Sequence, residues 1–156
     1  MKKLYSVERE YPVAVSALWD AWMNADALAS WYSPTDLKVV DGSVTSEPVI
    51  GGWWTVGVDV SQFGFNAYFF GTYSELEENK RIVHSMNYTQ DVAEFEARVI
   101  TPDAHTIEID FEDRGASSWV RFTQIGELPA DQAEGAKAGM ESYFDNLGIY
   151  LSEQNK

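Results

Sequence analysis

The 156-residue sequence is 45% hydrophobic, which predicts one domain with a packed core over residues 1–156. Its 25 acidic and 11 basic residues give a formal net charge of −14, which excludes nucleic acid and anionic membrane surfaces as favoured partners. The chain has no cysteine, which excludes disulfides, thiol nucleophiles and thiolate metal sites.

The first part of the chain predicts a strand followed by two short helices. Residues 3–11 form the expected strand, which ends at a proline. The helix expected over residues 15–23 starts near Ser16 and carries its leucine and both tryptophans on one side. Asn24 ends this helix and can cap a second helix over residues 25–32.

The middle of the chain predicts an antiparallel meander, because short polar turns separate runs of strand-forming residues. Strands are expected at residues 37–40, 53–60, 66–76, 82–88, 95–100, 105–111 and 118–124. In the last three of these strands, apolar residues alternate with polar or charged ones, so one face is apolar and the other is solvated. We interpret the following acids as this solvated face rather than as an acidic site: Glu94, Glu96, Glu108, Asp110 and Glu112.

Residues 130–152 predict a long amphipathic helix. Its apolar stripe recurs at three- and four-residue steps and consists of Ala136, Met140, Tyr143, Phe144, Leu147 and Leu151. Asp131 and Glu134 have the spacing of a capping box. Because the stripe must be covered, we expect an α+β fold. In the expected fold, a curved antiparallel sheet wraps around the long C-terminal helix, and two short helices follow the first strand.

Four stretches in this order carry a family resemblance: SALWDAWMNADALASWYSP, PVIGGWWTV, FGTYSELEENKRIVHSM and GAKAGMESYFDNL. The chain resembles the SRPBCC superfamily, whose helix-grip fold is that of START domains and the birch pollen allergen. Within it, the chain is similar to the branch related to the activator of the ninety-kilodalton heat-shock protein ATPase. That branch usually has Gly-Trp where this chain has Gly139 and Met140.

The resemblance implies a cavity between the sheet and the long helix, in which many relatives bind lipids, steroids or polyketides. We assign the cavity wall from strand alternation and helix spacing. The expected lining residues are Trp31, Tyr68, Phe70, His84, Phe95, Met140, Tyr143 and Phe144. His84 shares a strand face with Ile82 and Met86, so it is expected inside, paired to a tyrosine hydroxyl or a water.

The sequence contains no phosphate-binding loop, no dinucleotide fingerprint and no metal-binding histidine motif, so no cofactor, metal or catalytic residue is assigned. His105 follows a turn and is expected to be solvated. No apolar run follows the N-terminal lysines and no stretch is long enough to cross a bilayer, so a cytoplasmic location without membrane insertion is expected.

Three functions are compatible with these features. The favoured one is a small-molecule-binding protein whose internal cavity takes an apolar or amphipathic ligand. The second is an enzyme of the polyketide-cyclase type that uses His84 or Tyr143 as acid or base. The third is a regulatory interaction domain associated with a chaperone. Of the adjacent Trp53 and Trp54, one faces outward in a strand, which makes a homodimer contact a further hypothesis.

Overall fold

The computed structural model describes residues 2–154 of the protein. The strands are β1 (Lys2–Tyr11), β2 (Lys38–Val39), β3 (Thr45–Ser46), β4 (Trp53–Val60), β5 (Phe65–Glu77), β6 (Arg81–Thr89), β7 (His105–Arg114) and β8 (Ser117–Gly126). The helices are α1 (Val15–Met23), α2 (Ala25–Trp31), the 3-10 turn η1 (Ser61–Phe63), α3 (Val92–Ala97) and α4 (Ala130–Gln154).

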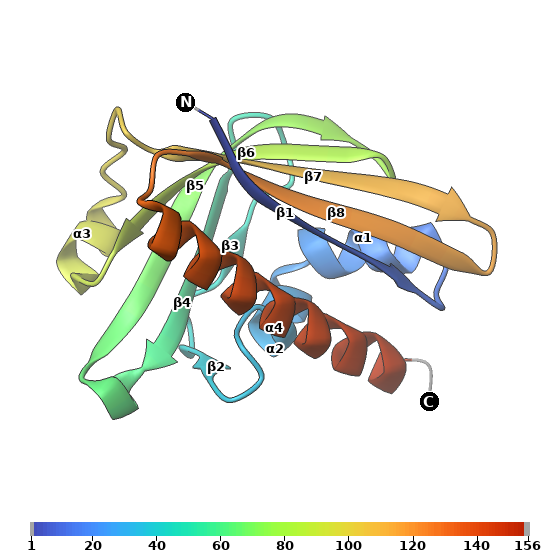
Figure 1. Cartoon of the computed structure of the whole chain (residues 1–156), viewed down its shortest axis with the longest axis horizontal. Coiled ribbons are helices and arrows are strands. Elements are labelled where there is room, and N and C mark those ends of the chain that lie inside the picture. Colours follow the sequence, from blue (N-terminus) through green and yellow to red (C-terminus); the bar gives the residue numbers. More distant parts are fainter. Residues whose placement is uncertain (1, 155–156) are drawn as a thin grey trace.

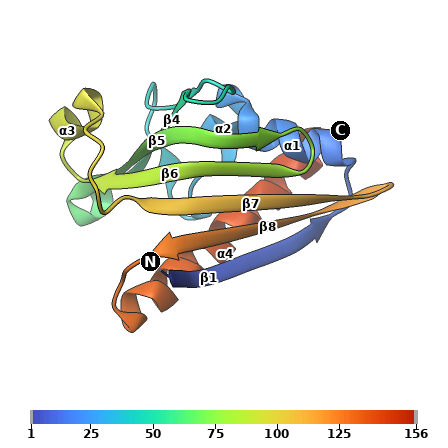
Figure 2. The ribbon, with the colours of Figure 1, turned by 90° about the horizontal axis from the view of Figure 1, so that it is seen from above.

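The strands form one curved antiparallel sheet in the order β1-β8-β7-β6-β5-β4-β2, with β3 paired to β4. The long helix α4 crosses the inner face of this sheet, and α1 and α2 lie beside it on the same side (Figure 1). Figure 2 shows α3 set apart from these helices, at the end of the molecule where β6 finishes. The expected α+β helix-grip fold is confirmed.

The core fills the space between the inner face of the sheet and the three helices α1, α2 and α4. Alternate strand residues point into it, as Ile107 and Ile109 of β7 and Val120 and Phe122 of β8 do. Trp22 of α1 lies at the centre of an aromatic cluster. Its ring meets those of Trp31, Tyr32, Phe122 and Phe144 at centroid distances of 4.7 to 6.1 Å.

The ends of the helices follow local capping chemistry. Asn24 ends α1 and caps α2, because its Oδ1 accepts hydrogen bonds from the amides of Asp26 and Ala27. In contrast, α1 begins after Ala14 without a side-chain cap, so Ser16 is not its start. Helix α4 begins at Ala130, which places Asp131 inside the first turn instead of at the capping position.

The strand predicted over residues 95–100 is wrong. That region contains α3, whose start is capped by Asp91 through hydrogen bonds to the amides of Ala93 and Glu94. The alternation of apolar and charged residues in this stretch is too short to distinguish a strand from one and a half turns of helix. As a result, β6 pairs directly with β7, and Glu94 and Glu96 lie on α3 instead of on the outer face of the sheet.

Candidate ligand-binding site

A pocket of about 560 Å³ opens at the end of the molecule where α4 begins. We call it the α4 pocket. It lies between the ends of β5, β6 and β8, the segment that leads into β7, and the first turns of α4. It is lined by Phe69, Phe70, Met86, Asn87, Tyr88, Thr89, Glu94, Val99, Thr101, Asp103, Ala104, His105, Gln124, Glu127, Leu128, Gln132 and Ala136.

The pocket combines an apolar wall with a polar rim. The wall includes Phe69, Met86, Val99, Leu128 and Ala136. Phe69 and Met86 also pack against the core, so the wall is continuous with the interior of the protein. An apolar wall with a few polar groups is the usual composition of a small-molecule site.

A chain of hydrogen bonds runs along the inner side of the pocket, from β1 through β8 to β7. The hydroxyl of Tyr5 donates to Oε1 of Gln124 over 2.6 Å, and Nε2 of Gln124 lies 2.7 Å from Nδ1 of His105. Burial raises the pKa of the Tyr5 phenol, which therefore stays protonated as the donor. Because the Gln124 amide then donates to Nδ1, the ring proton of neutral His105 is carried by Nε2.

Asn87 also lines the pocket. Its Nδ2 donates to the hydroxyl oxygen of Thr101 over 2.9 Å, which ties the end of β6 to the segment before β7. Its Oδ1 is buried and has no hydrogen-bond partner among residues 2–154. A buried acceptor without a donor costs free energy.

The structure distributes the predicted lining residues over three places. Phe70 lines the α4 pocket, whereas Tyr68 and Phe95 line a neighbouring hollow of about 320 Å³. The Phe95 ring of α3 stacks on Tyr68 at 4.6 Å and meets Phe70 edge-on at 6.1 Å. These contacts place Tyr68 and Phe70 on the outer face of β5, and Phe69 on the inner face.

Trp31, Met140 and Phe144 lie in the core. Trp31 is fully buried, and its Nε1 donates to the carbonyl of Ala21 over 2.8 Å. Phe144 is also fully buried, and its carbonyl accepts a hydrogen bond of 2.6 Å from the hydroxyl of Tyr11. Protein atoms enclose these side chains, and none of the three lines the α4 pocket.

His84 and Tyr143 also lie outside the α4 pocket. The His84 ring packs 4.3 Å from Trp54 and 5.9 Å from Tyr73, and its Nδ1 lies 2.9 Å from the carbonyl oxygen of Ser85. Its partner is therefore a backbone carbonyl instead of a tyrosine hydroxyl. Burial lowers the pKa of His84 to about 4 and raises that of Tyr143, so both stay neutral at pH 7.

Of the predicted lining residues only Phe70 lines the α4 pocket, and the residues that sequence reasoning missed include three polar ones, Asn87, His105 and Gln124. The sequence pattern could have indicated Gln124, because it follows Val120 and Phe122 at two-residue steps and is therefore a polar residue on the inner face of β8. No sequence pattern could have indicated His105, since its hydrogen bond to Gln124 depends on the register between β7 and β8. Gly126 leaves room for the His105 ring, because a Cβ there would clash with it.

Residues 2–154 were also searched for a metal site and for a membrane-spanning helix. No three His, Asp or Glu side chains within residues 2–154 are grouped so that they could hold a metal ion. None of the described helices is long and apolar enough to span a membrane.

The arrangement of sheet, α4 and pocket agrees with the comparison to known families. Residues 12–152 match the model of the family described as "Activator of Hsp90 ATPase homolog 1-like protein". The chain belongs to this family. It is therefore a member of the SRPBCC superfamily, in the branch that the sequence motifs indicated. No curated protein matches the chain significantly.

Solved structures of the same fold come from several bacteria. A family member from Silicibacter pomeroyi is 16% identical, with a TM-score of 0.79, and the match covers 96% of this chain and 98% of that one. A protein from Arthrobacter aurescens is 16% identical, with a TM-score of 0.77 and coverage of 95% and 85%. One from Nitrosomonas europaea is 18% identical, with a TM-score of 0.74 and coverage of 97% and 95%. These likenesses concern the fold.

Proposed function

We propose that this protein binds an apolar or amphipathic small molecule in the α4 pocket. The observation that carries the proposal is the pocket itself, whose volume of about 560 Å³ lies in the range of small-molecule sites. Its wall is apolar, and its polar groups lie at the rim and at two buried positions, Asn87 and Gln124. Membership in a superfamily whose fold commonly holds ligands in a cavity supports the same assignment.

The proposal is tested by filling the pocket from α4. Ala136 lines the pocket, so Ala136→Trp places an indole in the ligand's space. Ala138 lies on the exposed side of the same helix, so Ala138→Trp is the matched control. A neutral fluorescent hydrophobic dye is titrated into the wild type and both variants. Native mass spectrometry of freshly purified protein looks for a molecule that co-purifies.

We expect micromolar dye binding by the wild type, which corresponds to about −8 kcal/mol. Ala136→Trp is expected to weaken this binding about 10-fold or more, and Ala138→Trp to leave it unchanged. Thermal unfolding of both variants checks that the fold is retained. Equal dye binding by the two variants, or no binding by the wild type, contradicts the proposal.

A catalytic role for the same pocket would use His105. Its imidazole lines the pocket and is held by Gln124, an arrangement suited to an acid or a base. His105→Gln removes the titratable ring and keeps a hydrogen-bonding side chain. An activity of the cyclase type that His105→Gln abolishes, without loss of dye binding, would favour an enzyme over a carrier.

A further inference from the structure

Tyr5, Gln124 and His105 form a continuous hydrogen-bonded relay from the interior of the protein to the α4 pocket. Tyr5 and Gln124 are buried, at 7% and 5% exposure, and both Gln124 and His105 line the pocket. The amide of Gln124 is held at both ends, by the Tyr5 hydroxyl at 2.6 Å from Oε1 and by Nδ1 of His105 at 2.7 Å from Nε2. The imidazole is therefore fixed from inside the protein.

The direction of this relay decides which nitrogen of His105 carries the proton. A reversed Gln124 amide would leave the proton of the buried Tyr5 hydroxyl without an acceptor, because Oε1 is its only hydrogen-bond partner among residues 2–154. Nε2 of the amide therefore donates to Nδ1 of the ring. In neutral His105 the proton lies on Nε2, which points away from Gln124 because the two ring nitrogens face in different directions.

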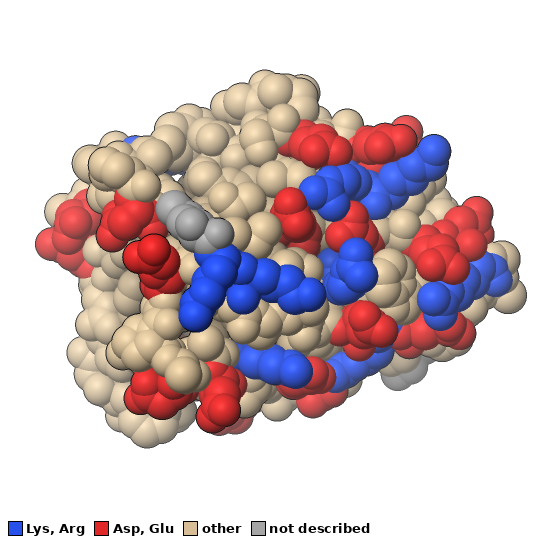
Figure 3. All heavy atoms as spheres, turned by 45° about the horizontal axis from the view of Figure 1, so that its top comes forward, with Lys and Arg blue, Asp and Glu red and all other residues tan. Residues whose placement is uncertain are grey.

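The Nε2–H group of His105 is a donor without a protein acceptor. Within residues 2–154, no hydrogen bond to this nitrogen and no ion pair with the ring is present. On the outer face of the sheet, lysines and arginines are interspersed with acids (Figure 3). The lining of the α4 pocket, all of which the structure describes, has no lysine or arginine. A neutral acceptor therefore suits this donor better than a carboxylate, whose charge the lining would leave uncompensated.

Gly126 of β8 supplies a second and independent observation, because it leaves room for the imidazole. A Cβ at this position would lie closer to Cδ2 and Nε2 of the His105 ring than van der Waals contact allows. The φ of Gly126 is not positive, so its backbone conformation alone would accept alanine. Met86 lies directly opposite His105 in the register of β6 and β7, so an apolar part of the wall adjoins the donor.

We propose that the ligand of the α4 pocket is a neutral carbonyl compound with an apolar body, such as a ketone or an ester, and that Nε2–H of His105 donates to its carbonyl oxygen. This inference rests on the proposed function and specifies its ligand class. The apolar body lies against Phe69 and Met86. Gln124 and Gly126 are positioning residues, since they set the tautomer and the place of the ring.

Three probes with the same naphthalene body test the carbonyl group. Methyl naphthyl ketone has a carbonyl where ethylnaphthalene has a methylene, and both are neutral. Naphthoate, substituted at the same ring position, is the anionic comparison. Each competes with the neutral dye for the wild type and the variants. Ethylnaphthalene is the more apolar of the two neutral probes, so the quantity compared between proteins is the ratio of ketone affinity to ethylnaphthalene affinity.

Two variants change the donor in different ways. His105→Phe removes the donor and keeps a ring, and it is expected to lower the affinity ratio about 10-fold. Gly126→Ala keeps the imidazole but displaces it from Gln124, and a similar loss is expected. Gly139→Ala is the matched control, since an added Cβ there meets no atom within 4 Å. Thermal unfolding of each variant checks that the fold is retained.

Two spectroscopic measurements separate a ligand contact from a change in packing. Nitrogen NMR of isotopically labelled protein, in mildly alkaline solution, is expected to show the proton of His105 on Nε2. His84 is expected to be the opposite tautomer, because its Nδ1 faces the carbonyl oxygen of Ser85. Loss of one set of signals in His105→Phe assigns the two rings. The infrared carbonyl band of the bound ketone is expected at lower frequency in the wild type than in His105→Phe.

The outcomes distinguish the two proposals. If the dye and both neutral probes fail to bind, the proposed function fails and this inference fails with it. If they bind but His105→Phe leaves the affinity ratio unchanged, the pocket binds ligands and the carbonyl assignment is overturned. Naphthoate binding as tight as that of the ketone also overturns it, as does a proton on Nδ1 of His105 or an identical carbonyl band in both proteins. Equal ratios for Gly126→Ala and Gly139→Ala would overturn the positioning role of Gly126.

Discussion

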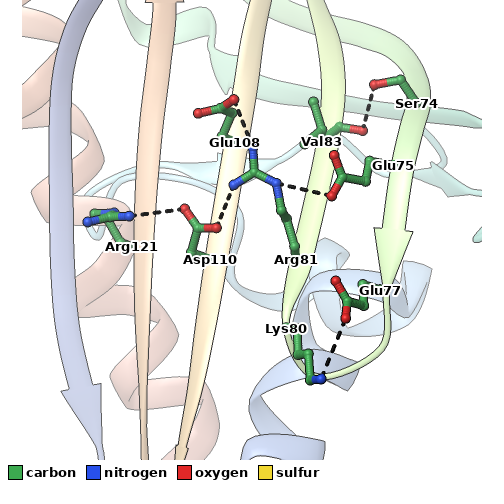
Figure 4. Close-up of polar contacts among 9 residues, drawn as sticks. All are labelled: Ser74, Glu75, Glu77, Lys80, Arg81, Val83, Glu108, Asp110 and Arg121. Carbon is green, nitrogen blue, oxygen red and sulfur yellow. Dashed lines mark hydrogen bonds and ion pairs between the residues drawn. The ribbon is translucent and has the colours of Figure 1, made fainter.

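Arg81 on β6 and Asp110 on β7 face each other across the outer surface of the sheet, with Nη1 and Oδ1 2.6 Å apart (Figure 4). The same guanidinium lies 2.9 Å from Glu108 and 3.2 Å from Glu75, and Asp110 also meets Arg121 at 3.4 Å. One cation therefore holds acids from β5 and β7 together. In a protein with 25 acids and 11 bases, such a cation also limits repulsion between neighbouring strands.

The first prediction concerns this network. Arg81→Met is expected to lower the free energy of unfolding by about 1 kcal/mol, because three partly exposed acids lose their shared partner. Urea unfolding should show a larger loss at low salt than at high salt, since salt screens the remaining repulsion. Lys80→Met is the control, because the Lys80–Glu77 pair is long, at 3.5 Å, and well exposed. A loss for Lys80→Met as large as that for Arg81→Met would contradict the network's importance.

The second prediction concerns the packing of α4 against the sheet. Phe144 is fully buried against Trp22, so Phe144→Ala leaves a cavity in the aromatic cluster. The free energy of unfolding is expected to fall by about 3–5 kcal/mol. Ile149→Ala on the same helix is the control, since that side chain is 51% exposed and its loss should cost well under 1 kcal/mol. Urea unfolding measures both, and similar losses would show that Phe144 does not anchor the helix.

Elements with a strong pattern were predictable from the sequence. The boundaries of α1 and β4 agree with expectation to the residue, because the hydrophobic spacing is clear in both elements, Asn24 ends α1 and Gly52 precedes β4. The expected strand over residues 66–76 is also present as β5, but its faces are harder to assign. An error of one residue exchanges the two sides of a strand, and this step separates Phe69 on the inner face from Phe70 on the outer one.

The pocket was less predictable because it depends on contacts between distant segments. Asn87 meets Thr101 only because α3 interrupts the meander and returns the chain past the end of β6. Gln124 meets His105 only through the register of β7 and β8. The sequence instead indicated aromatic residues as the cavity wall. Of these, Trp31 and Phe144 are fully buried in the core of the protein. Composition indicates that an apolar cavity is possible, whereas only tertiary structure shows which side chains line it.

The third prediction concerns pH. His84 is 5% exposed, and burial lowers its pKa from 6.5 to about 4. Above pH 6.5 the imidazole is neutral in both the folded and the unfolded protein, so the full stability is present. As the pH falls from 6.5 to about 4, the unfolded chain binds a proton that the folded protein does not. This difference is expected to lower the free energy of unfolding by ~3 kcal/mol.

His84→Leu should remove this part of the pH dependence. The substitution leaves no buried acceptor unpaired, because the carbonyl of Ser85 still accepts a hydrogen bond of 2.9 Å from Nε1 of Trp54. The carboxylates contribute equally to the wild type and the variant, so they cancel when the two curves are subtracted. Urea unfolding between pH 7 and pH 4 is therefore expected to show the wild type losing ~3 kcal/mol more than His84→Leu. Met86→Leu, two residues along the same strand face, should follow the wild-type curve, and parallel curves for all three proteins would mean that His84 does not titrate differently on folding.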